Sequence, residues 1–256
     1  MSRRDDVTDL YKPSERLEIA EKILFVTDIA AAAVSLVSNQ MVSSIAITAQ
    51  IVVALLYFIC STVDDGIFWY QAERQRRKNN IENGFGSRLS EFETDGYYNN
   101  NVEPSLEKYS LNTMESNFFS KEIAEKMLLK SSIMAIIAIV ALVIACRFVN
   151  NPDALLILAQ TAFSAYVLVD WIMLVIYKVR LETLYKDAYD TLIILNSEGV
   201  NQKAWSIAYI VEYEAIKAHY KVRLDGKIFT KCNDELSLKW QEILSHRDAV
   251  NTENNS

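Results

Sequence analysis

Two acids, Asp28 and Asp170, and two amides, Gln50 and Gln160, lie within apolar segments of this sequence. A carboxylate inside a membrane costs about 2.5–3.5 kcal/mol to insert, and it usually faces the interior of a helical bundle or water. For Asp170 we favour the bundle interior, on an ion pathway or at a gate. For Asp28, close to Lys22, a helix-end side chain that reaches the interface is an equally good interpretation. The amides of Gln50 and Gln160 predict interhelical hydrogen bonds worth about 1 kcal/mol or less each.

A basic group follows the aromatic residues at positions 68–70 and comprises Arg74, Arg76, Arg77 and Lys78. The net charge of the whole chain is −7, which argues against a general nucleic-acid-binding protein. We therefore interpret these residues as the stop after a membrane segment, attracted to anionic lipid head groups by about 1 kcal/mol per basic residue. A contact with an anionic signal stays open as an alternative.

Catalytic and metal-binding patterns are not evident. The chain has two histidines and three cysteines without ligand spacing, and no Ser/His/Asp or Cys/His set is evident. A phosphate loop at Gly84-Phe85-Gly86 would need a strand before it and a helix after it, so a turn with positive φ is the better interpretation. We expect no catalytic residue, no cofactor and no metal, and the protein is not expected to be an enzyme.

Four apolar segments, at about 23–38, 42–63, 131–149 and 154–179, supply the elements that position these residues. A helix needs about 20 predominantly apolar residues to cross a bilayer. The first segment is short and contains Asp28, so a buried helix outside the membrane is its alternative. The connections SNQM and NNPD are so short that each pair of segments must form an antiparallel hairpin.

The distribution of Lys and Arg gives the orientation, because basic residues flank the far ends of both hairpins while the tight turns are nearly free of them. We predict a multi-pass protein of the bacterial inner membrane with both termini cytoplasmic. Its parts are a cytoplasmic N-terminus (1–22), a first hairpin (23–63), a cytoplasmic middle region (64–130), a second hairpin (131–179) and a cytoplasmic helical tail (180–256). An aromatic belt at the cytoplasmic interface is expected from Trp69, Tyr70, Trp171 and Tyr177.

The helices are expected to continue into the cytoplasm after both hairpins. Apolar residues at spacings of three and four predict helices over about 180–195 and 202–222. A last helix is expected over about 233–247, with Asn233 or Asp234 as its N-cap. Residues 84–112 lack helical periodicity and predict a loop. The fold class is thus an all-α membrane protein: four transmembrane helices as two hairpins with helical cytoplasmic extensions.

Four sequence blocks carry a resemblance to a known group of proteins. They are AERQRRKNNIENGFGSRLS (72–90), DGYYNN (95–100), ESNFFSKEIAEKM (115–127) and YEAIKAHYKVRLDGKIFTKCNDELSLKW (213–240). With the two hairpins and the helical tail, the chain resembles the S-4TM and SLATT-like four-transmembrane effectors of bacterial antiphage defence, of the type found beside nucleotide-signal synthases or in retron systems.

The resemblance implies that an infection signal makes the protein permeabilise or disrupt the inner membrane, which halts the cell. It also implies a homo-oligomer in the lipid bilayer, triggered by a cyclic nucleotide or by a sensor protein of the same defence system. Two alternatives stay open. One is a small channel or transporter that uses Asp170, and the other is a membrane anchor that recruits a cytoplasmic partner.

Overall fold

The computed structural model describes residues 4–5, 7–35, 39–92, 94–95, 97–148, 167–195 and 200–254. Most of this part of the chain is helical, and turns and irregular segments join the helices. Its described strands are one antiparallel pair of two residues each, β1 (Arg4–Asp5) and β2 (Thr94–Asp95). The expectation of an all-α fold is therefore confirmed. The helices are α1 (Thr8–Ser35), α2 (Gln40–Val63), the π-helix η1 (Asp64–Phe68), α3 (Trp69–Phe85), α4 (Leu106–Phe148), α6 (Val167–Tyr189), the π-helix η2 (Asp190–Leu195), α7 (Val200–Tyr220) and α8 (Gly226–Asn254).

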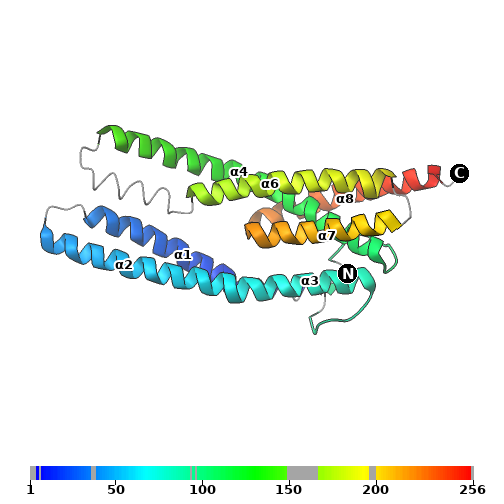
Figure 1. Ribbon diagram of the computed structural model, residues 1–256, viewed down its shortest axis with the longest axis horizontal. Helices are drawn as coiled ribbons and strands as arrows, with labels where there is room; N and C mark the ends of the chain where they lie inside the picture. Colours follow the sequence, from blue (N-terminus) through cyan, green and yellow to red (C-terminus); the bar gives the residue numbers. More distant parts are fainter. Residues whose placement is uncertain are drawn as a thin grey trace.

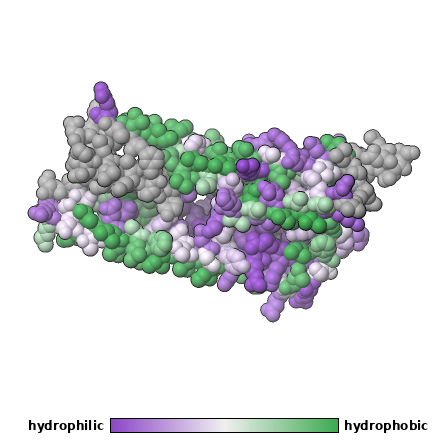
Figure 2. Space-filling model, viewed as in Figure 1, coloured by the Kyte–Doolittle hydropathy of each residue, from purple (hydrophilic) through white to green (hydrophobic). Residues whose placement is uncertain are grey.

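The helices form an elongated molecule with two parts (Figure 1). We call one part the apolar half; it contains α2 and the neighbouring portions of α1, α4 and α6. The polar half contains α3, α7, α8 and the remaining portions of α4 and α6. Apolar side chains predominate on the surface of the first part and polar ones on the second (Figure 2).

The first hairpin, formed by α1 and α2, is fixed at its turn by side-chain hydrogen bonds. Asn39 caps α2, because its Oδ1 accepts from the backbone N–H groups of Met41 and Val42. The hydroxyl of Ser43 donates to the carbonyl of Ser35 across the turn, at 2.7 Å. Ala32 is buried on α1, as is Ala46 on α2, and small residues such as these allow two helices to approach closely.

The helix from Gln40 to Phe85 runs without interruption through α2, η1 and α3, as the sequence predicts. By its length and composition it is the one helix among the described residues that is long and apolar enough to cross a membrane. Only 6% of its most apolar stretch is buried within the protein. Among the described residues nothing covers most of this apolar surface, a property typical of surfaces that contact another protein or a membrane.

The second hairpin is described in part. Helix α4 covers most of the third apolar segment, and α6 contains the described end of the fourth. The NNPD connection lies outside the described residues. The indole Nε1 of Trp171 on α6 donates to the hydroxyl of Ser132 on α4, at 2.9 Å, which joins the two helices where the apolar half meets the polar half.

The hydrophobic core lies in the polar half, between α4, η2, α7 and α8. The rings of Phe118 and Trp240 stack with centroids 6.1 Å apart. Around them pack further fully or nearly fully buried residues, among them Leu111, Met114, Leu192, Ile193, Tyr209 and Leu236. The polar half is thus a packed helical bundle, whereas large apolar side chains such as Leu55, Phe58, Ile136 and Val143 are exposed in the apolar half.

The structure corrects three predictions of local structure. Helix α8 begins at Gly226 rather than near residue 233, and its first N–H groups, of Lys227 and Ile228, donate to Asp225 Oδ1. The connection between α3 and α4 spans only residues 86–105, since α3 reaches Phe85 and α4 begins at Leu106. Gly86 ends α3 with φ of 60°, which confirms the expected positive-φ turn.

The aromatic belt is the third correction. Tyr177 is completely buried and Trp69 is 9% exposed, so neither ring is available to a lipid interface. Tyr177 packs in a cluster with Leu181 and Tyr213. Aromatic residues at the end of an apolar run serve equally well as core residues, and the sequence alone did not distinguish these two uses.

Candidate functional site

Four charged side chains from two helices meet inside the polar half, and we call them the charge quartet: Glu73 and Arg76 on α3, and Glu214 and Lys217 on α7. Each pair has i, i+3 spacing, which places both members on one face of their helix. Arg76 Nε lies 3.0 Å from Glu73 Oε2, and Arg76 Nη2 lies 2.5 Å from Glu214 Oε2. Lys217 Nζ lies 3.4 Å from Glu73 Oε1. The quartet is neutral overall, and it joins the two helices.

The electrostatics of the quartet follow from its burial. Burial raises the pKa of the Glu73 carboxyl, but Lys217, Arg76 and a hydrogen bond from Tyr11 together outweigh burial and hold this pKa well below its usual value. Burial lowers the pKa of Lys217, and the neighbouring Arg76 lowers it further, more than the two carboxylates raise it. Glu73 therefore stays ionised, while Lys217 gives up its proton more readily than an exposed lysine.

Helix α1 is attached to the quartet through Tyr11. Its hydroxyl donates to Glu73 Oε1 at 2.8 Å, and its ring meets the ring of Trp69 edge-on, with centroids 5.6 Å apart. One carboxylate, that of Glu73, thus contacts α1, α3 and α7 at once.

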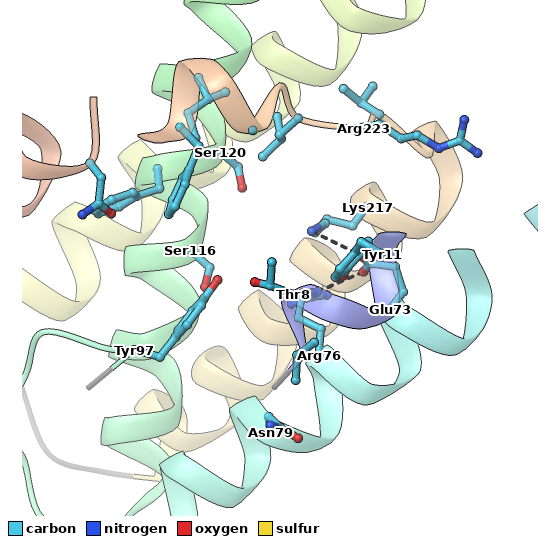
Figure 3. A pocket seen from close by; sticks show the side chains of 18 of the residues that line it. Thr8, Tyr11, Glu73, Arg76, Asn79, Tyr97, Ser116, Ser120, Lys217 and Arg223 are labelled. Atoms are coloured by element: carbon cyan, nitrogen blue, oxygen red, sulfur yellow. Dashed lines mark hydrogen bonds and ion pairs between the residues drawn. The ribbon is translucent and has the colours of Figure 1, made fainter. Parts of the chain in front are cut away.

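A cavity of about 430 Å³ lies beside the quartet. Its walls come from α1, α3, α4, α7, the connection between α7 and α8, the beginning of α8 and the segment around residues 97–99, and Figure 3 shows side chains around the opening. The volume falls within the range of about 300–1,000 Å³ that is typical of small-molecule sites. Arg76 and Lys217 of the quartet line it, together with the polar residues Thr8, Asn79, Ser116 and Ser120.

The segment 97–99 is held against the cavity by a buried carboxylate. Glu115 on α4 is 4% exposed and accepts hydrogen bonds from the backbone N–H of Asn99, at 3.0 and 3.2 Å, and from its amide Nδ2, at 2.6 Å. The adjacent rings of Tyr97 and Tyr98 pack edge-to-face with centroids 4.9 Å apart. This wall is therefore ordered by a hydrogen-bonded charge rather than by a helix or strand.

Another ionic cluster lies where α2 passes into α3, and we call it the junction. The fully buried carboxylate of Asp64, in η1, accepts a hydrogen bond from Arg223 Nη2. Asp65 lies 2.7 Å from Lys221 Nζ, and the Arg223 guanidinium lies over the ring of Trp69, 5.4 Å from its centroid. Arg223 also lines the cavity. The connection between α7 and α8 is thus bound both to the cavity and to the π-helix.

The predicted basic group does not act as a single surface. Arg76 lies in the quartet, where its guanidinium meets the carboxylates of Glu73 and Glu214, and it also lines the cavity. Its expected contact with lipid or with a signal stays a prediction. Arg77 lies 3.9 Å from Glu214 Oε2, and Lys78 is half-buried. Only Arg74 is exposed. Helical geometry explains this separation, since consecutive residues point about 100° apart around the axis.

The intramembrane candidates are not brought together at one point. Asp28 is half-buried on α1, and its Oδ1 is buried without a hydrogen-bond partner among the described residues. Gln50 is half-buried on α2, and Asp170 is exposed on the first turn of the described part of α6. Gln160 lies outside the described residues. The expectation that Asp170 faces the bundle interior stays a prediction, because residues 149–166, which precede it in the chain, lie outside the described residues.

Sequence reasoning missed the residues that the structure does bring together. The i, i+3 pairs Glu73/Arg76 and Glu214/Lys217 were a usable signal, because each puts opposite charges on a helix that also carries apolar residues. Asp64 and Asp65, directly after an apolar run, were another. What the sequence could not supply was the partner of each group, which lies more than 130 residues away in the chain.

The site has the features of a binding site: a cavity of small-molecule size, buried hydrogen-bonding groups and a compensated charge network. Within the described ranges, no group of three His, Cys, Asp or Glu side chains is placed to hold a metal ion. Comparison of the chain with protein-family models, with curated proteins and with solved structures found no match.

Proposed function

We propose that this protein is a multi-pass effector of the bacterial inner membrane that permeabilises the membrane when its polar half receives an infection signal. The observation that carries the proposal is the division of the molecule into an apolar half with exposed apolar helices and a polar half with its own core and cavity. Such a division suits a protein that receives a signal in water and responds in lipid.

The membrane arrangement that we propose has two hairpins, formed by 23–63 and 131–179, with both termini cytoplasmic. It is supported by the exposed apolar side chains on all four helices concerned, such as Ile23, Leu55, Ile136 and Ile172. A soluble monomer rarely exposes so large an apolar surface. The basic residues flanking the polar ends of the hairpins support the orientation.

The route from signal to membrane that we propose runs through the junction. A ligand or partner in the cavity acts on Arg223, which binds the π-helix at the end of α2. A signal can shift a conformational equilibrium only by binding one state more tightly than the other. The open state is proposed to be a homo-oligomer, since only 6% of the most apolar stretch of the helix from Gln40 to Phe85 is buried among the described residues of one chain.

Topology is tested by cysteine labelling of the full chain. Cys60, Cys146 and Cys232 are replaced by Ser, and single cysteines are introduced as Gln40→Cys, in the first tight turn, and as Lys227→Cys, at the start of α8. A membrane-impermeant maleimide applied to spheroplasts is expected to label the first and not the second. Labelling of both or of neither before lysis contradicts the proposed orientation.

Function is tested by infecting bacteria that produce the protein while a dye reports the membrane potential. We expect depolarisation and dye entry before phage release, and neither in cells that carry an empty vector. Growth arrest with unchanged membrane potential overturns the proposal. Transport of a solute without toxicity favours a channel or transporter instead, and a tail-binding partner without conductance favours a membrane anchor.

A further inference from the structure

We propose that the cavity binds a planar ring compound that accepts hydrogen bonds and carries at most one negative charge, a class that includes nucleosides and cyclic mononucleotides. The inference that a ligand binds here depends only on the geometry of the cavity. The inference that this ligand triggers the protein also depends on the proposed function. Three properties of the cavity carry the proposal: its donors, its rings and its balance of charge.

The first donor is the amide of Asn79 on α3. Asn79 is 4% exposed and lines the cavity. Its Oδ1 accepts from Gln75 Nε2, at 2.6 Å, and from Ser90 Oγ, at 3.2 Å. These contacts fix the orientation of the amide, and its Nδ2 has no partner among the described residues. A buried donor without a partner is unfavourable, and an acceptor on a ligand would satisfy it.

Lys217 supplies the second donor. Its ammonium has three hydrogens to donate, and it meets Glu73 Oε1 at 3.4 Å. The side chain is 11% exposed and projects toward the cavity in Figure 3. With Asn79 it makes the α3/α7 side of the cavity rich in donors, which selects carbonyl oxygens, ring nitrogens or a single anionic group.

The opposite side is aromatic. Tyr97 and Tyr98 form an edge-to-face pair, and the rings of Phe119 and Phe229 lie tilted against each other, with centroids 6.3 Å apart. Flat aromatic side chains favour stacking with planar rings, and nucleobases stack on Tyr and Phe with little dependence on sequence. Donors on one side and rings on the other fit a planar compound with acceptors at its edge.

The charge of the lining sets a limit on the charge of the ligand. Four carboxylates line the cavity, on Glu15, Glu18, Glu73 and Glu115, against three cations, on Arg76, Lys217 and Arg223. The cations are already paired with carboxylates of the protein. A ligand with two phosphates would bring a second negative charge into a lining that is already slightly acidic, without a cation to compensate it. This disfavours cyclic dinucleotides.

The experiment measures binding to the purified full-length protein in detergent, by calorimetry and by thermal unfolding. The probes are the four ribonucleosides, cyclic AMP and cyclic GMP, compared with cyclic di-AMP and cyclic di-GMP. We expect at least one of the first six to bind and to raise the unfolding midpoint, and both dinucleotides to bind at least tenfold more weakly. No binding by any of the six, or tighter binding by a dinucleotide, overturns the proposal.

The variant that locates the site is Asn79→Asp. It keeps the Oδ1 acceptor for Gln75 and Ser90, replaces the Nδ2 donor with a carboxylate oxygen and adds a negative charge to the lining, so we expect binding at least tenfold weaker. The matched control is Asn80→Asp, also a buried position of α3, whose Nδ2 donates to Thr113 Oγ1 and which does not line the cavity. Its binding is expected to be unchanged. Equal binding by wild type and Asn79→Asp overturns the proposal.

Tyr97→Leu gives a second measurement, in case Asn79→Asp does not fold. Loss of one ring from the aromatic side is expected to weaken binding at least fivefold, and unchanged binding contradicts the proposed stacking. Dye release from vesicles that contain the protein separates this site from the proposed function. If a probe binds but no dye is released, the proposed binding site stands and its role as the trigger is contradicted. If infected cells are permeabilised but no probe binds, the proposed function stands and the proposed binding site is contradicted.

Discussion

Arg223, between α7 and α8, forms a hydrogen-bonded ion pair with Asp64 in the π-helix between α2 and α3. The Asp64 side chain is completely buried, and the guanidinium is covered on one face by the ring of Trp69. The pair therefore connects the last two helices of the chain to the point at which the first hairpin leaves the apolar half.

Removal of this guanidinium is expected to destabilise the protein strongly. Arg223→Gln leaves the buried Asp64 carboxylate without its cation, and breaking a buried ion pair from one side costs about 3–5 kcal/mol. Thermal unfolding in detergent measures the change. Lys221→Gln is the control, because its ion pair with Asp65 is largely exposed and should contribute less than about 1 kcal/mol.

A double variant shows whether Asp64 and Arg223 act as a pair. Asp64→Asn combined with Arg223→Gln removes both charges and is expected to be more stable than Arg223→Gln alone. If the loss of stability in the double variant equals the sum of the losses in Asp64→Asn and Arg223→Gln, the two groups are not coupled, and the ion pair does not contribute the expected stability.

The charge quartet predicts a second contrast between buried and exposed carboxylates. Glu214→Gln removes the partner of Arg76 Nη2 at a position that is 15% exposed, and we expect a loss of about 3 kcal/mol, at the lower end of the range for buried pairs. Glu182→Gln removes a half-exposed carboxylate that pairs with Lys178 and Lys186 on α6, and its effect should stay below about 1 kcal/mol. Similar losses for both variants would contradict the structural role of the quartet.

The quartet also predicts how stability depends on pH. The pKa of Glu73 is lower in the folded protein than its ordinary value of 4.5, so the unfolded chain binds the proton more tightly. Glu73 therefore contributes its full stabilisation above pH about 4.5, and this is lost as the pH falls toward the folded pKa. Unfolding midpoints measured from pH 7 to pH 3 are expected to fall less steeply below about 4.5 in Glu73→Gln than in the wild type.

Two glycines in the same long helix should respond oppositely to alanine. At Gly84 an added Cβ would lie 2.6 Å from the Cβ of Tyr109 and 2.9 Å from its Cα, so Gly84→Ala is expected to cost about 1–3 kcal/mol by overpacking α3 against α4. At Gly66 nothing lies within 4 Å of the added atom, and Gly66→Ala should stabilise the helix by up to about 1 kcal/mol. Thermal unfolding of the two variants checks both signs.

The start of α8 is tested by Asp225→Ala. Asp225 Oδ1 accepts from two backbone N–H groups of the first turn, and loss of such a cap costs about 0.5–2 kcal/mol. Asp234→Ala, at the position expected from the sequence to begin the helix, should change stability by less than about 0.5 kcal/mol. The opposite order of effects would place the beginning of the helix near residue 233.

The helical architecture follows from sequence patterns that depend on local spacing. Apolar runs, the two tight turns and the spacing of Leu181, Leu184 and Leu192 define hairpins and extensions because neighbours along a helix recur every three or four residues. The early start of α8 could have been predicted in the same way, since Ile228, Cys232, Leu236 and Trp240 continue one stripe toward the N-terminus.

The site was not predictable by the same means. Glu73 meets Lys217, and Asp64 meets Arg223, only after α3 and α7 have packed side by side. Arg76 and Arg74 illustrate the difficulty, because both belong to the same run of basic residues. They are two positions apart on the helix and therefore point in different directions, so that Arg76 forms an ion pair with Glu214 whereas Arg74 is exposed. The sequence around a residue shows which side chains are charged. Whether such a side chain is buried depends on a helix from a distant part of the chain that packs over it.

The π-helix η1 sets the rotational phase of the long helix that contains it. A π-turn accommodates roughly one residue more than an α-turn, and one residue corresponds to about 100° of rotation around the axis. Were η1 to become α-helical while α2 stayed in place, α3 would turn by about this angle, and Glu73 and Arg76 would turn away from Glu214 and Lys217. The Asp64–Arg223 pair therefore fixes an angle as well as a contact, and the charge quartet can form only at that angle.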